Sequence, residues 1–327
     1  MLARVACLSP YDEGTVRAMF RGRHQIEVLL VPDPPAQPAV LAACAGAHLV
    51  IADRRHKHLV DRTVLEQMRQ CKLIQQAAVG FDTIDHRAAA ELGIPVANAA
   101  GYNKEAVADW TVMAMLALVR NSFWGDRQLR AGRWGPDDRM RNEMIGRDLG
   151  AMTVGIIGLG NVGSAVARRL GAFGSRIVFT DVDRKELAGA EQVDLETLLR
   201  RSDVICVHTP LDVDTKALID AQALARMKPG SFLVNAARGP IVDEQALVEA
   251  LETRHLAGAA LDVFEIEPLP PDSPLRALEN VVLAPHVGGA TIEADARLDE
   301  MVGENLLRVL DGLPPFNVVN AVEVKPS

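Results

Sequence analysis

The chain has 327 residues, of which 49% are hydrophobic and 4% aromatic, and its formal net charge at pH 7 is -8. This length exceeds the usual range of one hydrophobic core, so two domains are expected, and the composition excludes disordered and fibrous proteins. The acidic balance provides no general attraction to nucleic acid or to anionic membranes, so neither is expected as a partner.

The cysteines indicate the compartment. They are Cys7, Cys44, Cys71 and Cys206, and they form neither a CxxC pair nor a metal-binding spacing with histidine. Such usage predicts no metal site and favours a reducing, cytoplasmic environment. The sequence has no signal-peptide core and no apolar run of membrane-spanning length, so a cytoplasmic protein without a membrane anchor is expected.

The first hundred residues alternate short apolar runs with helical patterns, which predicts a βα series around a parallel sheet. The expected strands are RVACLS, IEVLLV, HLVIAD, LIQQAA and GIPVANAA. Helices are expected through Phe20, near Ala39 and from Asp61.

Residues 105–130 are predicted to form one long helix. Its apolar residues extend round most of the circumference: Val107, Trp110, Val112, Met113, Met115, Leu116, Leu118 and Val119. Such a helix should be buried on more than one side, which predicts a subunit contact and a homodimer. Burial between two domains of one chain is the alternative.

A second βα series follows, and its strands are nearly continuous apolar runs, as in parallel sheets covered on both faces. They are MTVGIIG, RIVFTD, DVICVHTP, GSFLVNAA, LAGAALDVF and NVVLAPH. A last helix is expected from about Ile292 to Leu310, and this end should pack back on the first unit. The predicted class is α/β with two doubly wound parallel-sheet domains, a discontinuous one of residues 1–100 plus 291–327 and one of residues 101–290.

Gly158, Gly160 and Gly163 form a GxGxxG pattern between the apolar run MTVGIIG and an alanine-rich helix. There the glycines permit a tight turn, backbone approach to a pyrophosphate and close helix–strand packing. Asp181 ends the next strand, at the spacing of an acid that binds adenosine ribose. The pattern predicts a dinucleotide loop, and the acid favours NAD because its charge repels the 2′-phosphate of NADP.

Arg184 and Lys185 follow closely and leave an alternative open. They are expected to be solvated residues in the first turn of a helix, but they could instead bind a 2′-phosphate.

Three residues separated by long gaps follow: Arg238 in NAARGPIVDE, Glu267 in LDVFEIEPLP and His286 in LAPHVGGAT. Reduction of a 2-keto acid by a nicotinamide cofactor needs a cation for the carboxylate and carbonyl oxygen, and an acid for the developing alkoxide. A carboxylate beside an imidazole stabilises the imidazolium, and arginine binds a planar carboxylate through two hydrogen bonds. Together these residue types predict a catalytic set, although each alone would be an ordinary surface or strand-end residue.

Residues 47–320 resemble the D-isomer-specific 2-hydroxyacid dehydrogenase family. The resemblance rests on AAVGFDTID, GLGNVG, HTPLDVDTKALI, NAARGPIVDEQAL, DVFEIEP and PHVGGAT. It implies a Rossmann NAD-binding domain, a flavodoxin-like substrate-binding domain and a subunit contact through the helix at 105–130. It also implies that His286 donates and accepts the proton, Glu267 is its hydrogen-bonded partner, and Arg238 clamps the substrate carboxylate and carbonyl.

The resemblance further implies binding residues. Val79 and Gly80 correspond to the substrate-carboxylate loop, and Arg238 and His286 complete the substrate site. The implied cofactor contacts are Gly158, Gly160, Asn161, Val162, Gly163, Asp181, Thr209, Ala236, Ala237, Arg238, Asp262, His286, Gly288 and Gly289. Asp262, flanked by GAAL and VF, should be buried and would need partners such as backbone amides or the nicotinamide carboxamide.

The basic stretch ADRRHKH, residues 52–58, is expected to be a solvated loop. The alternative is a site for a second carboxylate or a phosphate on the substrate. Gln76 stands where the phosphoglycerate-specific members of the family carry an arginine, which argues against a phosphoglycerate substrate.

The sequence therefore predicts an oxidoreductase that transfers a hydride between NAD(H) and a small D-2-hydroxy or 2-keto acid. Formate and phosphite dehydrogenases share the scaffold, but the formate enzymes pair their histidine with glutamine where this chain has Glu267. The alternative from another class is an NAD(H)-sensing binding protein that resembles the corepressors related to this family.

Overall fold

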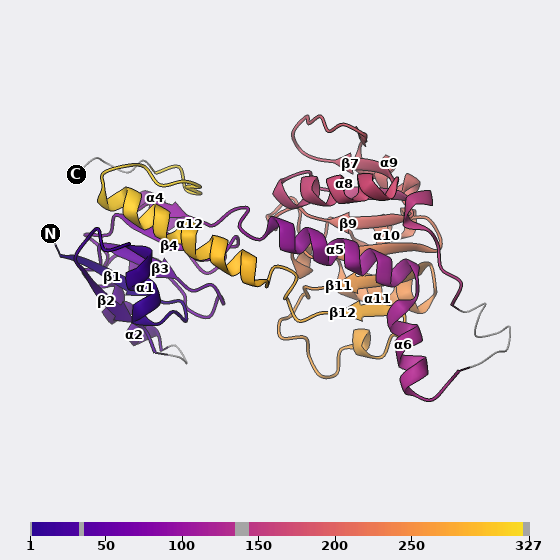
Figure 1. Ribbon diagram of the computed structural model, residues 1–327, viewed down its shortest axis with the longest axis horizontal. Coiled ribbons are helices and arrows are strands. Elements are labelled where there is room, and N and C mark those ends of the chain that lie inside the picture. The colour runs from indigo at the N-terminus through magenta and orange to yellow at the C-terminus, as the bar shows by residue number, and fades with distance from the viewer. Residues whose placement is uncertain (1, 33–35, 135–143, 323–327) are drawn as a thin grey trace. The chain divides into compact units, whose positions relative to one another are not determined.

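The computed structural model describes residues 2–32, 36–134 and 144–322. The chain forms two compact units, Met1–Asn103 with Thr291–Ser327 and Lys104–Ala290, which we call the first and the second unit. Each unit has a parallel sheet with helices packed around it (Figure 1).

The sheet of the first unit has five parallel strands in the order β2-β1-β3-β4-β5. The strands are β1 (Ala3–Cys7), β2 (Ile26–Leu30), β3 (Leu49–Ala52), β4 (Leu73–Gln76) and β5 (Val96–Ala97). The helices are α1 (Glu13–Met19), α2 (Gln37–Cys44), α3 (Arg62–Leu65), α4 (His86–Glu91) and α12 (Ile292–Leu310). This strand order is that of flavodoxin-like sheets.

The sheet of the second unit has seven parallel strands in the order β12-β11-β10-β9-β6-β7-β8. The strands are β6 (Thr153–Ile157), β7 (Arg176–Thr180), β8 (Ala190–Gln192), β9 (Val204–Val207), β10 (Ser231–Asn235), β11 (Leu256–Leu261) and β12 (Val281–Leu283). The α-helices are α5 (Lys104–Val119), α6 (Ser122–Arg130), α8 (Asn161–Phe173), α9 (Leu195–Arg201), α10 (Ala221–Arg226) and α11 (Glu244–Glu252). The described part of this unit also contains the short 3-10 helices η1 (Leu149–Ala151), η2 (Gly239–Ile241) and η3 (Pro274–Arg276).

With β6 as its first strand, this sheet has the Rossmann order 3-2-1-4-5-6, extended by β12. The order reverses between β6 and β9, and in open α/β sheets ligands bind beyond the carboxyl ends of the strands at such a reversal. The two sheets confirm the predicted fold class.

The prediction of one helix over residues 105–130 is wrong. α5 ends at Val119, and α6 starts at Ser122 after Asn121, whose backbone is left-handed with φ 50°. Asparagine tolerates this conformation better than most residues, so the chain can change direction there.

The burial of α5 has a cause within its own unit. Met115 and Leu118 lie in a buried cluster with Ile156, Val166 and Val204, which come from the sheet and from α8. The apolar circumference of α5 is therefore largely covered by the second unit itself.

The C-terminal helix α12 belongs to the core of the first unit. Leu298, Val302 and Leu306 pack in a buried cluster with Val5 and Leu49 of the sheet. These apolar positions recur at helical spacing, which gives α12 one core-facing side. The role of the first unit in substrate binding stays a prediction.

In the described ranges no helix is long and apolar enough to cross a membrane. All four cysteines are free, and three of them are buried. A cytoplasmic location stays a prediction from cysteine usage.

Candidate active site

The carboxyl ends of three neighbouring strands carry the predicted catalytic residues. Arg238 follows β10, Glu267 follows β11 and His286 follows β12, and these strands are adjacent in the sheet. Because parallel strands end at the same edge, residues far apart in sequence come to one side of the second unit.

Glu267 and His286 form a direct pair. The Nδ1 atom of His286 lies 2.8 Å from Oε2 of Glu267, and the other carboxylate oxygen accepts a hydrogen bond from Phe264 N–H at 3.1 Å. Partial burial acts to raise the pKa of the Glu267 carboxyl, but the bonds from His286 and Phe264 and the charge of Arg238 outweigh it and lower the pKa. Glu267 is thus an anion at neutral pH, held against the imidazole.

Asp262 organises the backbone around His286. Its carbonyl oxygen accepts a hydrogen bond from His286 N–H at 2.8 Å, and its two carboxylate oxygens accept from Val287 N–H and Gly288 N–H at 2.8 and 2.7 Å. A Cβ added at Gly288 would lie 2.8 Å from Oδ2 of Asp262, so a side chain does not fit there. The backbone-amide partners expected for a buried Asp262 are therefore present, and burial raises the pKa of its carboxyl.

The turn held by Asp262 leaves His286 with a left-handed backbone, φ 55°. This conformation is uncommon outside glycine and costs free energy, so it persists only where surrounding contacts impose it. Three hydrogen bonds to one aspartate provide that constraint. No residue pattern around His286 predicted this strained backbone.

Arg238 has an extended backbone and directly precedes η2. Asn235, the last residue of β10, braces its loop by donating from Nδ2 to Arg238 O at 2.9 Å and accepting from Ala237 N–H at 3.0 Å. The guanidinium donates to Ala237 O at 2.7 Å and acts electrostatically on Glu267. The bracing role of Asn235 was not predicted, although a polar residue ending a buried strand could have suggested it.

The glycine loop connects β6 to α8 as predicted. A Cβ at Gly158 would lie 2.8 Å from His208 O, and one at Gly163 would lie 2.1 Å from Gly158 O, so neither position admits a side chain. A Cβ at Gly160 would meet nothing within 4 Å, and no side chain caps the N-terminus of α8. An exposed backbone at the start of a helix can bind a phosphate group, so this loop fits a dinucleotide.

Asp181 follows β7 and faces the glycine loop. Its Oδ2 atom accepts hydrogen bonds from Leu159 N–H at 2.7 Å and from Lys185 Nζ at 2.8 Å. Burial acts to raise the pKa of Asp181, but these bonds and that from Asp183 N–H lower it. The expectation of a helix at Arg184 and Lys185 is wrong, because the chain from 182 to 189 is irregular.

The other implied cofactor contacts also lie in the second unit, at strand ends or next to them. Asn161 and Val162 begin α8, Thr209 follows β9, Ala236 and Ala237 follow β10, and Gly288 and Gly289 follow His286. All of these segments lie beyond the carboxyl ends of the sheet, where the Rossmann order predicts a ligand.

Val79 and Gly80 lie in the first unit, in the loop after β4. Asn98 fixes this loop by donating from Nδ2 to Val79 O at 2.7 Å. Within the described ranges, the N–H groups of Val79 and Gly80 have no acceptor. Two successive unpaired amides can bind a carboxylate.

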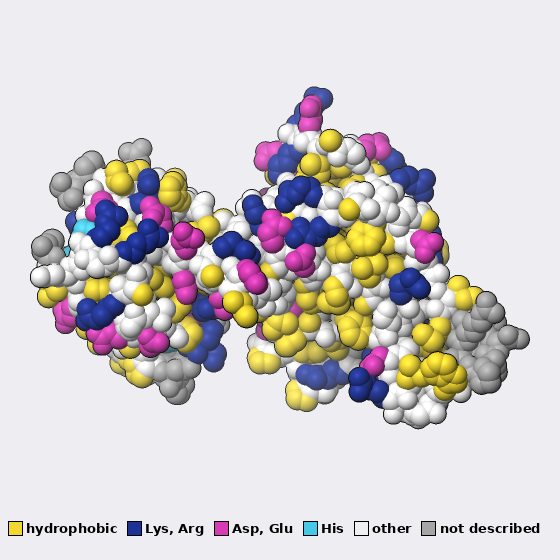
Figure 2. All heavy atoms as spheres, in the orientation of Figure 1, with side chains coloured by type: hydrophobic (Ala, Val, Ile, Leu, Met, Phe, Trp, Pro, Cys, Tyr) yellow, Lys and Arg dark blue, Asp and Glu magenta, His cyan; other side chains and the backbone are white. Residues whose placement is uncertain are grey.

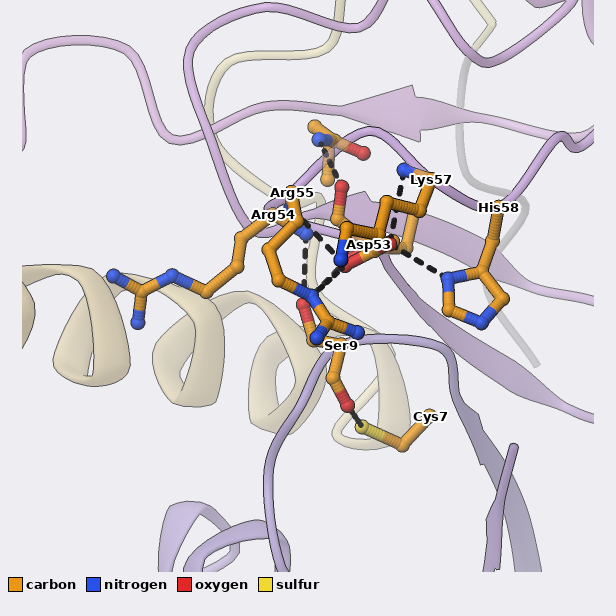
Figure 3. A network of polar contacts seen from close by, with 9 residues as sticks. Cys7, Ser9, Asp53, Arg54, Arg55, Lys57 and His58 are labelled. Carbon is orange, nitrogen blue, oxygen red and sulfur yellow. Dashed lines mark hydrogen bonds and ion pairs between the residues drawn. The ribbon is translucent and has the colours of Figure 1, made fainter. Parts of the chain in front are cut away.

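The basic stretch is organised by a buried acid, so the expectation of a solvated loop is wrong for Asp53 and His58. Both residues are buried, and the carboxylate of Asp53 contacts His58 Nδ1 at 2.6 Å and Arg55 N–H and Lys57 N–H at 3.0 Å each (Figure 3). Burial acts to raise the pKa of Asp53, but these donors lower it. The basic stretch therefore folds around the buried carboxylate of Asp53.

The cations of this loop are partly neutralised. Arg54 pairs with Asp295 of α12 at 2.6 Å, and Arg55 Nε lies 3.4 Å from Asp53. Lys57 is exposed. The positive charge that this loop offers to a second carboxylate or a phosphate of the substrate is therefore smaller than the sequence suggested. In the described residues no group of His, Cys, Asp or Glu could hold a metal ion.

Comparison with known proteins identifies the family of this chain. The sequence model of the D-isomer specific 2-hydroxyacid dehydrogenase NAD binding domain matches residues 112–288. Glyoxylate reductase of Thermofilum pendens is 42% identical over 276 residues, covering 82% of this chain and 80% of that protein. Glyoxylate reductase of Aeropyrum pernix is 40% identical over 314 residues, covering 92% and 91%.

Among solved structures, the holo form of D-mandelate dehydrogenase from Rhodotorula graminis has a TM-score of 0.90 at 28% identity, covering 100% of both chains. The match to the family's NAD-binding domain lies within the second unit, which contains the glycine loop, Arg238, Glu267 and His286. The chain belongs to the D-isomer-specific 2-hydroxyacid dehydrogenase family, and it is an NAD-dependent oxidoreductase of that family.

Proposed function

We propose that this enzyme interconverts a small 2-keto acid and the corresponding D-2-hydroxy acid, with His286 as the acid–base residue, Glu267 as its partner and Arg238 as the substrate clamp. The observation that carries the proposal is the 2.8 Å contact between His286 and Glu267 at the carboxyl edge of the sheet. Both side chains remain partly exposed there, so the pair can meet a substrate.

In the direction of reduction, His286 donates a proton to the oxygen on C2 as that oxygen becomes an alkoxide. The anionic Glu267 stabilises the imidazolium before the transfer and fixes the ring through Nδ1, which leaves Nε2 for the substrate. In the direction of oxidation, the neutral imidazole accepts the same proton.

Arg238 holds the substrate carboxylate and polarises the carbonyl oxygen, because its planar guanidinium can make two parallel hydrogen bonds. In the first unit, the unpaired amides of Val79 and Gly80 are the donors that fit a carboxylate. Asn235 and Asp262 act indirectly, since they fix the loops that carry Arg238 and His286.

The second unit fits NAD at its carboxyl edge. Gly158, Gly160 and Gly163 with the first amides of α8 would hold the pyrophosphate, and Asp181 would bind the adenosine ribose. Asn161, Val162, Thr209, Ala236, Ala237, Asp262, Gly288 and Gly289 would line the rest of the cofactor site. When bound, the nicotinamide supplies or accepts the hydride at C2 of the substrate.

We propose glyoxylate and similarly small 2-keto acids as substrates, because two glyoxylate reductases are at least 40% identical to most of this chain. The test is NADH oxidation with glyoxylate, hydroxypyruvate, pyruvate and phenylpyruvate at equal concentrations. We expect the highest kcat/KM with the two smallest or most polar acids, glyoxylate and hydroxypyruvate. Folded protein that binds NADH but oxidises it with none of these acids would instead support the NAD(H)-sensing alternative.

We also propose a homodimer through α5 and α6. Hydrophobic side chains gather on the face of the second unit that carries these helices (Figure 2), and Met113, Phe123 and Leu129 are exposed there. Exposed apolar groups of this kind favour association. Light scattering at micromolar concentration should give twice the 35.3 kDa of one chain. A mass of one chain would contradict the dimer.

A further inference from the structure

We propose that Lys185 sets the discrimination between NADH and NADPH, and that Lys185 and Arg184 form a subsite for an adenosine 2′-phosphate, so that the enzyme accepts both cofactors. The inference rests on the proposed function, which puts the adenosine ribose at Asp181. It concerns only residues of the second unit.

The first observation is that Asp181 is already occupied by donors of the protein. Oδ2 accepts from Leu159 N–H at 2.7 Å and from Lys185 Nζ at 2.8 Å, and Oδ1 accepts from Asp183 N–H at 3.1 Å. A carboxylate offers about four acceptor positions. Most of the acceptor positions of Asp181 that would bind the two ribose hydroxyls of NAD are therefore occupied by donors of the protein.

The second observation concerns charge. An acid at this place disfavours NADP because its negative charge repels the 2′-phosphate. Here the ammonium of Lys185 lies at contact distance from that charge, and the Asp181 side chain is almost fully covered, which limits screening by solvent. The repulsion that selects NAD is thus largely cancelled.

The ammonium is held in place before any ligand binds. Gln192, at the end of β8, accepts a hydrogen bond from Lys185 N–H at 3.0 Å and donates from Nε2 to Asp183 O at 2.8 Å. Lys185 Nζ also donates to Leu159 O at 3.3 Å in the glycine loop. A preorganised cation loses less entropy on binding a phosphate than a free lysine does.

The third observation is the space beside this cation. An open cavity of about 930 Å³ is lined by the irregular segment after β7 and by β8. Two cationic side chains, Arg184 and Lys185, line this cavity together with two carboxylates, Asp183 and Glu186. The formal charges of these four side chains cancel. A phosphate group bearing about two negative charges can bridge both cations.

The test measures binding, not turnover. NADH and NADPH are titrated by fluorescence into the wild-type enzyme and into Lys185→Gln, which keeps the length of the side chain but removes its charge. We expect wild-type Kd values within about tenfold of each other, and a Kd ratio of NADPH to NADH that rises at least about fivefold in the variant. Lys185→Arg should retain the wild-type ratio.

Lys228→Gln is the matched control. Lys228 also pairs with an aspartate of the second unit, Asp203, at 3.2 Å, but it does not line the cavity. This variant loses the same charge and an equivalent ion pair, so it should leave the ratio unchanged. An equal shift in both variants would show a general effect of net charge and would overturn the proposal.

A second measurement needs no substitution. Adenosine 2′,5′-bisphosphate and 5′-AMP compete with NADH for the wild-type enzyme, and the bisphosphate should bind at least as tightly as 5′-AMP. A bisphosphate that binds more than about tenfold more weakly, or a Kd ratio that Lys185→Gln does not move, would overturn the 2′-phosphate subsite alone. Failure of NADH itself to bind would overturn the proposed cofactor site, and this inference with it.

Discussion

The pairs Glu267–His286 and Asp53–His58 have nearly the same contact geometry in different surroundings. In each, a carboxylate oxygen lies close to an imidazole Nδ1, at 2.8 Å in the second unit and 2.6 Å in the first. The side chains of His286 and Glu267 are 45% and 37% exposed, whereas those of His58 and Asp53 are both 0% exposed. The two pairs therefore differ in access to a ligand.

Access decides what each pair can do. His58 Nε2 is buried and has no partner among the described residues, so no substrate can approach it to exchange a proton. Asp53 instead collects donors from its own loop and fixes the segment that carries Arg54, Arg55 and Lys57. A carboxylate–imidazole contact alone is thus insufficient to identify an acid–base site, and exposure at a strand end is the additional requirement.

The largest effect should come from His286→Ala. We expect turnover to fall by about 100-fold or more, because the variant lacks the proton donor, while NADH still binds through the other residues of the cofactor site. Steady-state kinetics and fluorescence titration measure the two quantities. Turnover within a few-fold of wild type in the purified variant would refute the assignment of His286.

Substitution in the buried pair should act on stability instead. Asp53→Asn replaces one acceptor oxygen of the carboxylate by an amide nitrogen, so at least one of its buried hydrogen-bond donors loses its acceptor. We expect the free energy of unfolding to fall by about 3 kcal/mol. Urea unfolding at pH 7 measures it. His58→Ala should also destabilise the protein, and if neither variant does so, the pair has no structural role.

The exposed pair should respond through the pH profile. In Glu267→Gln the imidazolium loses its anionic neighbour, so the reduction rate should decline at lower pH than in wild type. Profiles of kcat/KM between pH 5 and 9 test this. Superimposable profiles would show that Glu267 does not act on His286.

The smallest effect is the pH dependence of the stability that Asp53 contributes. Its pKa is lower in the folded protein, so its contribution is fully present above the unfolded-state pKa of about 3.9 and is lost as the pH falls through the folded value. The stability difference between wild type and Asp53→Asn should therefore shrink as the pH falls below about 4. A difference that grows in acid would mean that Asp53 is not an anion in the folded protein.

The sequence was sufficient where chemistry depends on local spacing. Of Gly158, Gly160 and Gly163, two have no room for a Cβ, because the backbone of His208 faces Gly158 and the carbonyl of Gly158 faces Gly163. Alternating βα patterns predict both sheets. The motifs around Arg238, Glu267 and His286 identified the family, and each follows a strand that is recognisable by its apolar run. The proton-transfer role assigned to them stays a prediction.

The burial and the ion pairs of the charged loops became known only from the tertiary structure. Asp53 and His58 lie in a stretch with the composition of a solvated loop, and their burial depends on the surrounding fold, including Gln76 of β4, whose side chain donates to Asp53 O at 3.2 Å. Arg54 is likewise neutralised by Asp295, which is 241 positions away in the chain. Lys185 pairs with Asp181 in a segment that is irregular where a helix was expected. The free energy of a charged side chain depends on its burial and on the partners that the fold brings to it, and neither is encoded in the residues next to it.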